Sequence, residues 1–137
     1  MIICVEDEQN ICELEVYTLQ SVGMEAEGCA SGKELFALLE QHIPELIVLD
    51  EPLSGLDPVN AELFKKIIRR EVEKGKYIIM SSHQMATVEE FCTDITILDR
   101  SKTVLQGHLN DIKKSYGRVN LRLKAEQDVS RWIEQAG

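Results

Sequence analysis

Aromatic residues, prolines and long apolar runs are scarce in this chain of 137 residues. Only 5% of the residues are aromatic, and three are prolines. No apolar run approaches the ~20 residues that a membrane-spanning helix needs. The sequence also shows no charged segment followed by an apolar one, as a secretion signal would have. We therefore expect no membrane segment, no secretion and a cytoplasmic location.

Close cysteine pairs are also missing. The four cysteines are far apart in the sequence, with no CxxC pair and no histidine at metal-ligand spacing: Cys4, Cys12, Cys29 and Cys92. Apolar residues surround Cys4 and Cys92, which favours reduced, packed thiols over disulfide bridges.

Positive charge is nearly absent from the first part of the chain. The net charge is −9, which argues against a general nucleic-acid binder. Residues 1–50 hold eleven acidic residues and one basic residue, whereas residues 51–137 hold thirteen acidic and fourteen basic residues. So sharp a change within one small domain suggests two sequence origins.

The hydrophobic pattern alternates between strands and helices along the whole chain. It predicts strands at 2–5, 24–29, 46–49, 77–80 and 95–98, the last of which forms a hairpin with 103–105. It predicts helices at 10–22, 31–43, 58–74, 86–91 and 109–116, then an edge strand at 119–123 and a last helix at 129–135. Ser31 with Glu34, and Asp57 with Pro58, are typical of helix starts. Leu63, Phe64, Ile67, Ile68 and Val72 are the expected buried stripe of the third helix.

Repeated β-α-β units predict an α/β fold: a doubly wound, flavodoxin-like parallel sheet in a single domain, 1–137. Sites in such sheets lie beyond the carboxyl ends of the strands. This rule selects Glu6, Asp7, Asp50, Glu51, Ser81, Ser82 and His83.

Residues 1–50 resemble a response-regulator receiver domain. Val5-Glu6-Asp7-Glu8 looks like its acidic pocket, and Leu49-Asp50 looks like the strand end with the phosphoacceptor aspartate. The resemblance implies Mg²⁺ held by Glu6, Asp7 and Asp50, with Asp50 forming an acyl phosphate. It also implies a histidine kinase as partner, if the receiver function survives, and the strand order 2-1-3-4-5. We expect the hairpin and the 119–123 strand to be added at the far edge.

Residues 45–137 resemble the second half of an ABC-transporter nucleotide-binding domain. The segment 46–51 looks like a Walker B strand that ends in Asp50 and the catalytic base Glu51. Ser54-Gly55-Leu56-Asp57-Pro58 looks like the D-loop, and Ser81-Ser82-His83 looks like the switch-histidine loop. This resemblance implies transporter subunits as partners. The two resemblances overlap at 44–58, so we interpret the chain as a hybrid, engineered or recombined, of residues 1–50 and 51–137; the alternative is one divergent family.

Each half lacks part of its family's machinery. The nearest candidate for a phosphate-binding loop, 28–34, is one residue short and has Glu34 where a hydroxyl is required, so a helix-capped turn is the favoured interpretation. The Leu-Ser-Gly-Gly-Gln signature is absent as well, so Glu51 and His83 would be vestigial ATPase residues. The receiver lysine after the fifth strand has no counterpart, because Asp99-Arg100-Ser101 stands there, whereas Ser82 is predicted to be the hydroxyl that binds the phosphoryl group.

Three hypotheses follow from these residues. The first is a receiver-like module with weak Mg²⁺ binding and weak phosphorylation at Asp50. The second is an ATP-binding fragment of an ABC transporter. The third, which we favour, is a hybrid that is not an enzyme and for which ATP is not an expected ligand, with Mg²⁺ binding as a residual property. The oligomeric state is left open, although the contrast in charge between the halves raises a head-to-tail dimer.

Overall fold

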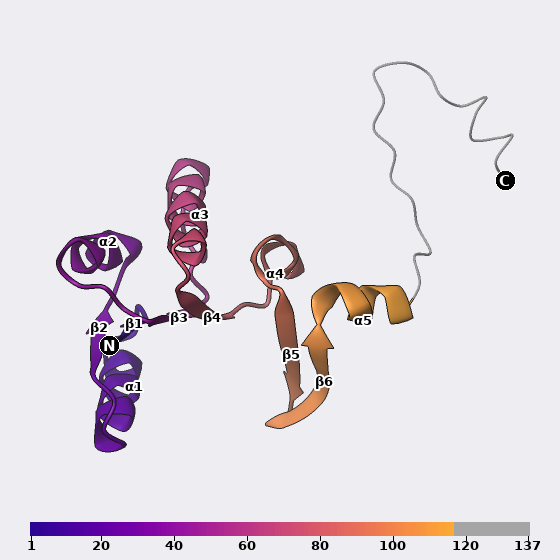
Figure 1. The fold of residues 1–137 in the computed structure, drawn as a ribbon, viewed down its shortest axis with the longest axis horizontal. Helices are drawn as coiled ribbons and strands as arrows, with labels where there is room; N and C mark the ends of the chain where they lie inside the picture. The colour runs from indigo at the N-terminus through magenta and orange to yellow at the C-terminus, as the bar shows by residue number, and fades with distance from the viewer. Residues whose placement is uncertain (117–137) are drawn as a thin grey trace, which may run out of the picture. The chain divides into compact units, whose positions relative to one another are not determined.

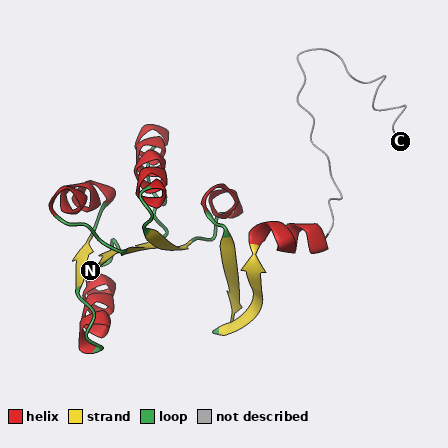
Figure 2. Ribbon diagram, viewed as in Figure 1, coloured by secondary structure: helices red, strands yellow, loops and turns green. Residues whose placement is uncertain are grey.

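The computed structural model describes residues 1–116, which form alternating strands and helices followed by a hairpin and a short helix. In chain order the elements are β1 (Ile2–Val5), α1 (Gln9–Ser21), β2 (Ala26–Cys29), α2 (Gly32–Gln41), β3 (Leu46–Asp50), α3 (Pro58–Glu73), β4 (Tyr77–Ser81), α4 (Met85–Phe91), β5 (Asp94–Asp99), β6 (Lys102–His108) and α5 (Leu109–Ser115). Figures 1 and 2 show this alternation. The chain divides into two compact units, and the second unit begins at Cys92.

The first unit is built on a parallel four-stranded sheet with the order β2-β1-β3-β4. Strand β1 is central and pairs with both β2 and β3, and β3 pairs in turn with β4. The apolar run of β1 and β3 suits strands that are covered on both faces. This order confirms the predicted flavodoxin-like, doubly wound fold.

Helices cover both faces of this sheet. Figure 1 shows α1 on one side and α2 and α3 on the other. The core lies on the α2 and α3 side, where strand residues alternate inward and meet the two helices; its fully buried members include Ile3, Ile47, Leu49 and Leu35. The side chains of Phe64 and Ile68 bring α3 into the same cluster.

The buried stripe of α3 is narrower than the sequence predicts. Phe64 and Ile68 are buried, but Leu63 is 57% exposed and Val72 is 51% exposed. At 100° per residue, Leu63 and Val72 lie on either side of the line through Phe64 and Ile68, so only the centre of the stripe touches the sheet. Glu71, at 3% exposed, occupies that line instead.

Both predicted helix starts are confirmed. The Ser31 hydroxyl accepts from the Glu34 amide at 3.3 Å, and the Glu34 carboxylate accepts from the Ala30 amide at 2.9 Å. At the start of α3, Asp57 accepts from the amides of Val59 and Asn60 at 3.0 and 3.2 Å. These bonds satisfy amides that no helical carbonyl can reach.

The second unit contains an antiparallel hairpin of β5 and β6 followed by α5. The sequence predicts this hairpin, but it also places its first strand beside β4, and β5 instead pairs only with β6 among the described residues. The physical reason is local: Arg100 and Ser101 both adopt positive φ, at 48° and 61°, which suits a tight turn whose twist matches the hairpin. Strand β6, separated from β5 by only two residues, therefore competes well with the more distant β4 as the pairing partner of β5.

Some predictions lie beyond these observations. The predicted strand at 119–123 and helix at 129–135 lie outside the described residues. The single-domain boundary of 1–137 stays a prediction. No helix in residues 1–116 is long and apolar enough to cross a membrane.

Candidate functional site

The carboxyl ends of three neighbouring strands bring together the polar residues that the sequence selects. Glu6 and Asp7 follow β1, Asp50 ends β3, and Ser81 ends β4. Because the strands are parallel and in register, with Asp50 opposite Ser81, these ends share one edge of the sheet.

Glu6 is a buried carboxyl group within this edge. Its side chain is only 4% exposed, and its Oε1 accepts from the Glu8 amide at 2.8 Å. That hydrogen bond lowers the pKa of Glu6, but burial and the neighbouring carboxyls outweigh it and leave the pKa raised. The carboxyls responsible are those of Asp7 and Asp50.

Asp50 is paired with the hydroxyl at the end of the neighbouring strand. Ser81 donates its hydroxyl to Asp50 Oδ1. Ser82, predicted to be the hydroxyl that binds a phosphoryl group, donates to Glu51 Oε2 at 3.2 Å, and its predicted role stays a prediction. The register explains the difference, since Ser81 lies directly opposite Asp50 and Ser82 lies one residue beyond it. The strand-end rule had selected both serines but could not rank them.

A second polar cluster lies immediately after Asp50. Glu51 has a positive φ of 37°, and its carboxylate accepts from the His83 amide at 2.7 Å and contacts His83 Nδ1 at 2.6 Å. Burial raises the pKa of Glu51, but the bonds from His83 and Ser82 outweigh this and lower it. Glu51 and His83, which come from distant parts of the sequence, are thus brought together as a carboxylate–histidine pair.

The side chain of His83 is 75% exposed, so its ring faces solvent on the side away from Glu51. Its neighbour Ser82 accepts from the Gln84 amide at 3.1 Å, just before α4 begins. Ser82 thus satisfies the Gln84 amide ahead of α4, and Glu51 contacts both the amide and the ring of His83.

The carboxylates at the carboxyl edge of the sheet are suitable ligands for a hard cation such as Mg²⁺, but their side chains are not arranged as a complete metal site. Carboxylate oxygens are the ligands that Mg²⁺ prefers, and the raised pKa of Glu6 shows that acidic groups crowd one another here. Within residues 1–116, however, no group of three or more His, Cys, Asp or Glu side chains is arranged to hold a metal ion. The bond from Ser81 to Asp50 occupies one of the oxygens that a cation would need.

The glycine-rich turn at 28–34 has a packing role. A Cβ atom on Gly28 would lie 2.4 Å from Cys12 Sγ, and one on Gly32 would lie 2.7 Å from the Phe64 ring. Both glycines therefore allow helices to approach closely, which explains them without a bound phosphate. The predicted helix-capped turn is confirmed by the Ser31 cap of α2.

The four cysteines are free thiols. Cys4, Cys12 and Cys29 are buried, and Cys92 is partly buried. Burial raises the pKa of Cys4 to about 11 and that of Cys29 to about 12, so neither is a reactive thiolate at neutral pH. The prediction of packed thiols is confirmed for these residues.

Comparison with curated proteins finds similarity to ABC transporter ATP-binding proteins. An 88-residue stretch, 64% of the chain, is 47% identical to the uncharacterized ABC transporter ATP-binding protein YhaQ of Bacillus subtilis. A stretch covering 63% of the chain is 45% identical to a second such protein, from Alkalihalophilus pseudofirmus. The chain spans only 30% and 32% of the length of these two relatives.

Comparison with family models and solved structures finds similarity to response regulators. The fold is similar to that of the chemotaxis response regulator CheY4 of Vibrio cholerae, with a TM-score of 0.51, 24% identity, and coverage of 65% of this chain and 74% of that one. The family model for the response regulator receiver domain matches residues 2–103. This match and the 88-residue similarity cannot both fit into 137 residues without overlapping, and the receiver match extends well past the predicted boundary at residue 50. The chain therefore belongs to the response regulator receiver domain family, and it shares about 64% of its length with ABC transporter ATP-binding proteins.

Proposed function

We propose that the chain is a receiver/ABC hybrid whose surviving chemistry is that of the receiver: weak Mg²⁺ binding by Glu6, Asp7 and Asp50, and slow phosphorylation of Asp50. One observation carries this proposal. The Asp50 carboxylate, the buried Glu6 and the Ser81 hydroxyl meet at the carboxyl edge of the parallel sheet. Three elements from both sequence halves are needed to build that arrangement.

The reaction follows from the groups present. An Asp50 oxygen attacks the phosphorus of an acyl phosphate, the bond to the leaving carboxylate breaks, and an aspartyl phosphate forms. Bound Mg²⁺ would offset the negative charge of the incoming group. Ser81 would exchange its bond to Asp50 for one to a phosphoryl oxygen.

We expect the transfer to be slow because one fixed positive charge is missing. The receiver lysine has no counterpart in the sequence, where Asp99-Arg100-Ser101 follows the fifth predicted strand. A preorganised cation beside a developing anion is often worth about 3 kcal/mol, so its loss should slow the reaction about a hundredfold. Within this proposal, a histidine kinase is the natural donor partner, and nucleic acid is not a partner.

ATP binding is the second candidate, and a specific contact favours it. Glu51 and His83 pair at 2.6 Å, as a catalytic base and a switch histidine would. Against it, the glycines of the 28–34 turn are needed for close packing against Cys12 and Phe64. Glu34 stands where a phosphate-binding loop has a hydroxyl for Mg²⁺, and it caps a helix. We therefore propose no ATPase activity, and transporter subunits are partners only under this second candidate. A calorimetric titration with ATP should show no micromolar binding, and micromolar binding would revive the candidate.

The experiment that tests the proposed site is a Mg²⁺ titration followed by amide NMR. We expect millimolar Mg²⁺ to shift the amides that follow β1 and β3 in the wild type. Asp50→Asn should abolish these shifts, whereas Glu73→Gln, an exposed carboxyl on α3, should leave them unchanged. Shifts that persist in Asp50→Asn, or no shifts in any variant, would contradict the proposed metal site.

A further inference from the structure

Glu51 directly follows Asp50 in the sequence, but the two carboxylates have different partners. Asp50 accepts from the Ser81 hydroxyl. Glu51 Oε2 accepts from the Ser82 hydroxyl at 3.2 Å, and Glu51 Oε1 accepts from the His83 amide at 2.7 Å and contacts the His83 ring at 2.6 Å. Consecutive Cα atoms are only about 3.8 Å apart, so the two carboxylates could also come close together. The hydrogen bonds instead hold the Glu51 carboxylate against the β4–α4 loop, residues 82–84.

The main chain at Glu51 has an uncommon conformation. Its φ of 37° lies in the left-handed region, which residues other than glycine seldom adopt. The Glu51 amide donates to the Ser81 carbonyl at 3.2 Å, and the contacts of the Glu51 carboxylate help to offset the local strain. The Glu51 side chain is 30% exposed. Its direction is therefore set by its hydrogen bonds more than by packing.

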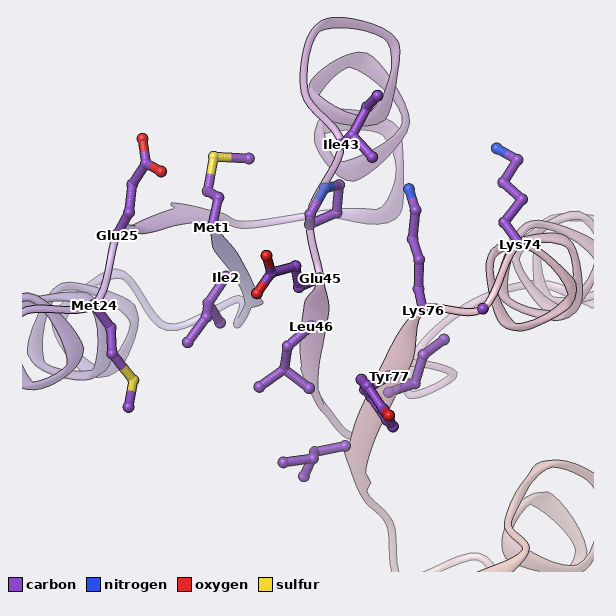
Figure 3. Close-up of a pocket in the computed structure, with 14 residues that line it drawn as sticks. Met1, Ile2, Met24, Glu25, Ile43, Glu45, Leu46, Lys74, Lys76 and Tyr77 are labelled. Atoms are coloured by element: carbon purple, nitrogen blue, oxygen red, sulfur yellow. The ribbon is translucent and has the colours of Figure 1, made fainter.

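The apolar groove of the first unit lies away from these residues. It has a volume of about 920 Å³ and is found near the starts of β1, β3 and β4, where Met1, Leu46 and Tyr77 line it (Figure 3). Asp50 and Ser81 are the last residues of β3 and β4, so they lie at the opposite edge of the sheet. Hydrogen bonds at the strand ends, rather than the walls of this groove, therefore position the charges near Asp50.

A freely moving Glu51 would oppose the chemistry proposed for Asp50. Asp7 and Asp50 already contribute to the raised pKa of Glu6, so three acidic groups crowd this edge. An incoming phosphoryl group is negatively charged as well, and a fourth carboxylate that could swing toward it would repel it. The donors on residues 82 and 83 hold that fourth charge on the β4–α4 loop.

We propose that His83 is a positioning residue for the Asp50 site: together with Ser82, it holds the Glu51 carboxylate on the β4–α4 loop, away from the phosphoryl group that Asp50 accepts. The inference rests on the proposed phosphorylation of Asp50. It gives the Glu51–His83 pair a role that requires no nucleotide. All of these residues belong to the first unit, and the contacts that carry the inference lie within it.

A pair of variants of equal length at position 51 tests the proposal. Glu51→Asp and Glu51→Asn both shorten the side chain, so that it no longer reaches the loop, and both residue types tolerate positive φ, so only the charge differs. We expect the gain of a phosphoryl group from acetyl phosphate, followed by intact mass, to be about fivefold slower in Glu51→Asp than in Glu51→Asn. Salt screens charge but not shape, so raising it from about 0.1 M to about 1 M should bring the two rates together. Glu73→Gln, an exposed carboxyl on α3, is the control and should react as the wild type does.

His83→Ala tests the holding contact itself. It removes the ring contact and should slow the transfer about twofold when Glu51 is present, but not in the Glu51→Asn background, where no charge needs to be held. Equal slowing in both backgrounds would show a structural role for His83 and overturn the inference. Equal rates in Glu51→Asp and Glu51→Asn beside a phosphorylated wild type would also overturn it while leaving the proposed function intact. A wild type that gains no phosphoryl group would overturn both.

Discussion

Glu6 and Asp50 show how a functional arrangement can oppose folding at the scale of single residues. Glu6 is buried with carboxyl neighbours, and its pKa is raised even though the Glu8 amide donates to it. The ionised form is therefore less favourable in the folded chain than in the unfolded one. Such crowding is costly for stability, and under the proposed function a bound cation would relieve it.

Removing the charge of Asp50 should stabilise the fold. Asp50→Asn keeps an oxygen that can accept from Ser81 but removes one source of repulsion on Glu6. We expect the melting temperature at pH 7 to rise by roughly 3 °C. A raised pKa in the folded state means that the folded chain binds this proton more tightly than the unfolded chain does. Wild-type stability should therefore increase as the pH falls toward the raised pKa of Glu6. The difference in melting temperature between Asp50→Asn and the wild type should then narrow. Thermal melts at several pH values measure this gap, and a gap that widens toward low pH would contradict the interpretation.

Glu71 has the opposite electrostatic situation. Burial raises its pKa, but the bonds to Lys74 and Lys76 outweigh burial, and its pKa is lowered overall. Glu71→Gln should lower the free energy of unfolding by about 3 kcal/mol, mainly because it leaves the Lys76 ammonium, whose side chain is only 9% exposed, without its carboxylate partner. Glu73→Gln, two residues along the same helix and exposed, is the control and should change little.

The pH dependence of Glu71 separates its charge from its packing. A lowered folded pKa contributes stability that is present above the ordinary value of 4.5 and is lost as the pH falls through the folded pKa. The difference in stability between wild type and Glu71→Gln should therefore shrink below pH 4.5. Urea denaturation at pH 7 and at low pH measures it, and an unchanged difference would show that shape alone matters.

At the scale of elements, the turn between β2 and α2 tests whether its glycines serve packing. Gly32→Ala adds a methyl group at 2.7 Å from the Phe64 ring, and we expect it to destabilise the fold by about 1–3 kcal/mol despite the better helix propensity of alanine. In the background Phe64→Leu, the same substitution should cost less, because the flat ring is gone. Chemical denaturation of the four proteins completes the cycle, and equal costs in both backgrounds would remove Phe64 from the explanation.

Local sequence signals predict most of the elements, and long-range choices account for the differences. Capping residues such as Ser31 and Asp57 accept hydrogen bonds from amides no more than three residues away, so the sequence alone predicts these caps. The pairing of Asp50 with Ser81 depends on the β3–β4 register, which no local pattern specifies to one residue. The pairing of β5 has a different cause, because the local turn at Arg100 and Ser101 favours β6 over the distant strand β4.

The candidate site was predictable in position but not in detail. The rule for the carboxyl ends of parallel strands selected Glu6, Asp50 and Glu51 correctly as neighbours of one edge. The burial of Glu6 and the link from Glu51 to His83 emerged only from the fold, because each depends on packing between segments far apart in sequence.

At the scale of the whole molecule, the cysteines report on folding of the first unit. Cys4, Cys12 and Cys29 are buried there, and Cys92 is only partly buried. We expect a thiol reagent at pH 8 to modify Cys92 first and the other three only as the chain unfolds. Cys92→Ser should remove the fast phase in a stopped-flow assay. Four equal rates in the wild type would indicate that the first unit lacks a fixed core.

Both matched families fit the apolar strand β3, which ends in Asp50. The receiver family model runs through residues 2–103, past the change in charge at residue 50, while the ABC similarity covers 88 residues. The sheet continues through the overlap with β3 paired on both sides. A site assembled from both halves is therefore the most informative place to ask whether the hybrid has a function.

The most direct measurement is the intact mass of the chain after incubation with acetyl phosphate and Mg²⁺. We predict the slow gain of one phosphoryl group in the wild type, its loss in Asp50→Asn, a reduced rate in Ser81→Ala and a nearly unchanged rate in Ser82→Ala. No gain in the wild type, or an equal gain in Asp50→Asn, would contradict the assignment of a working receiver site.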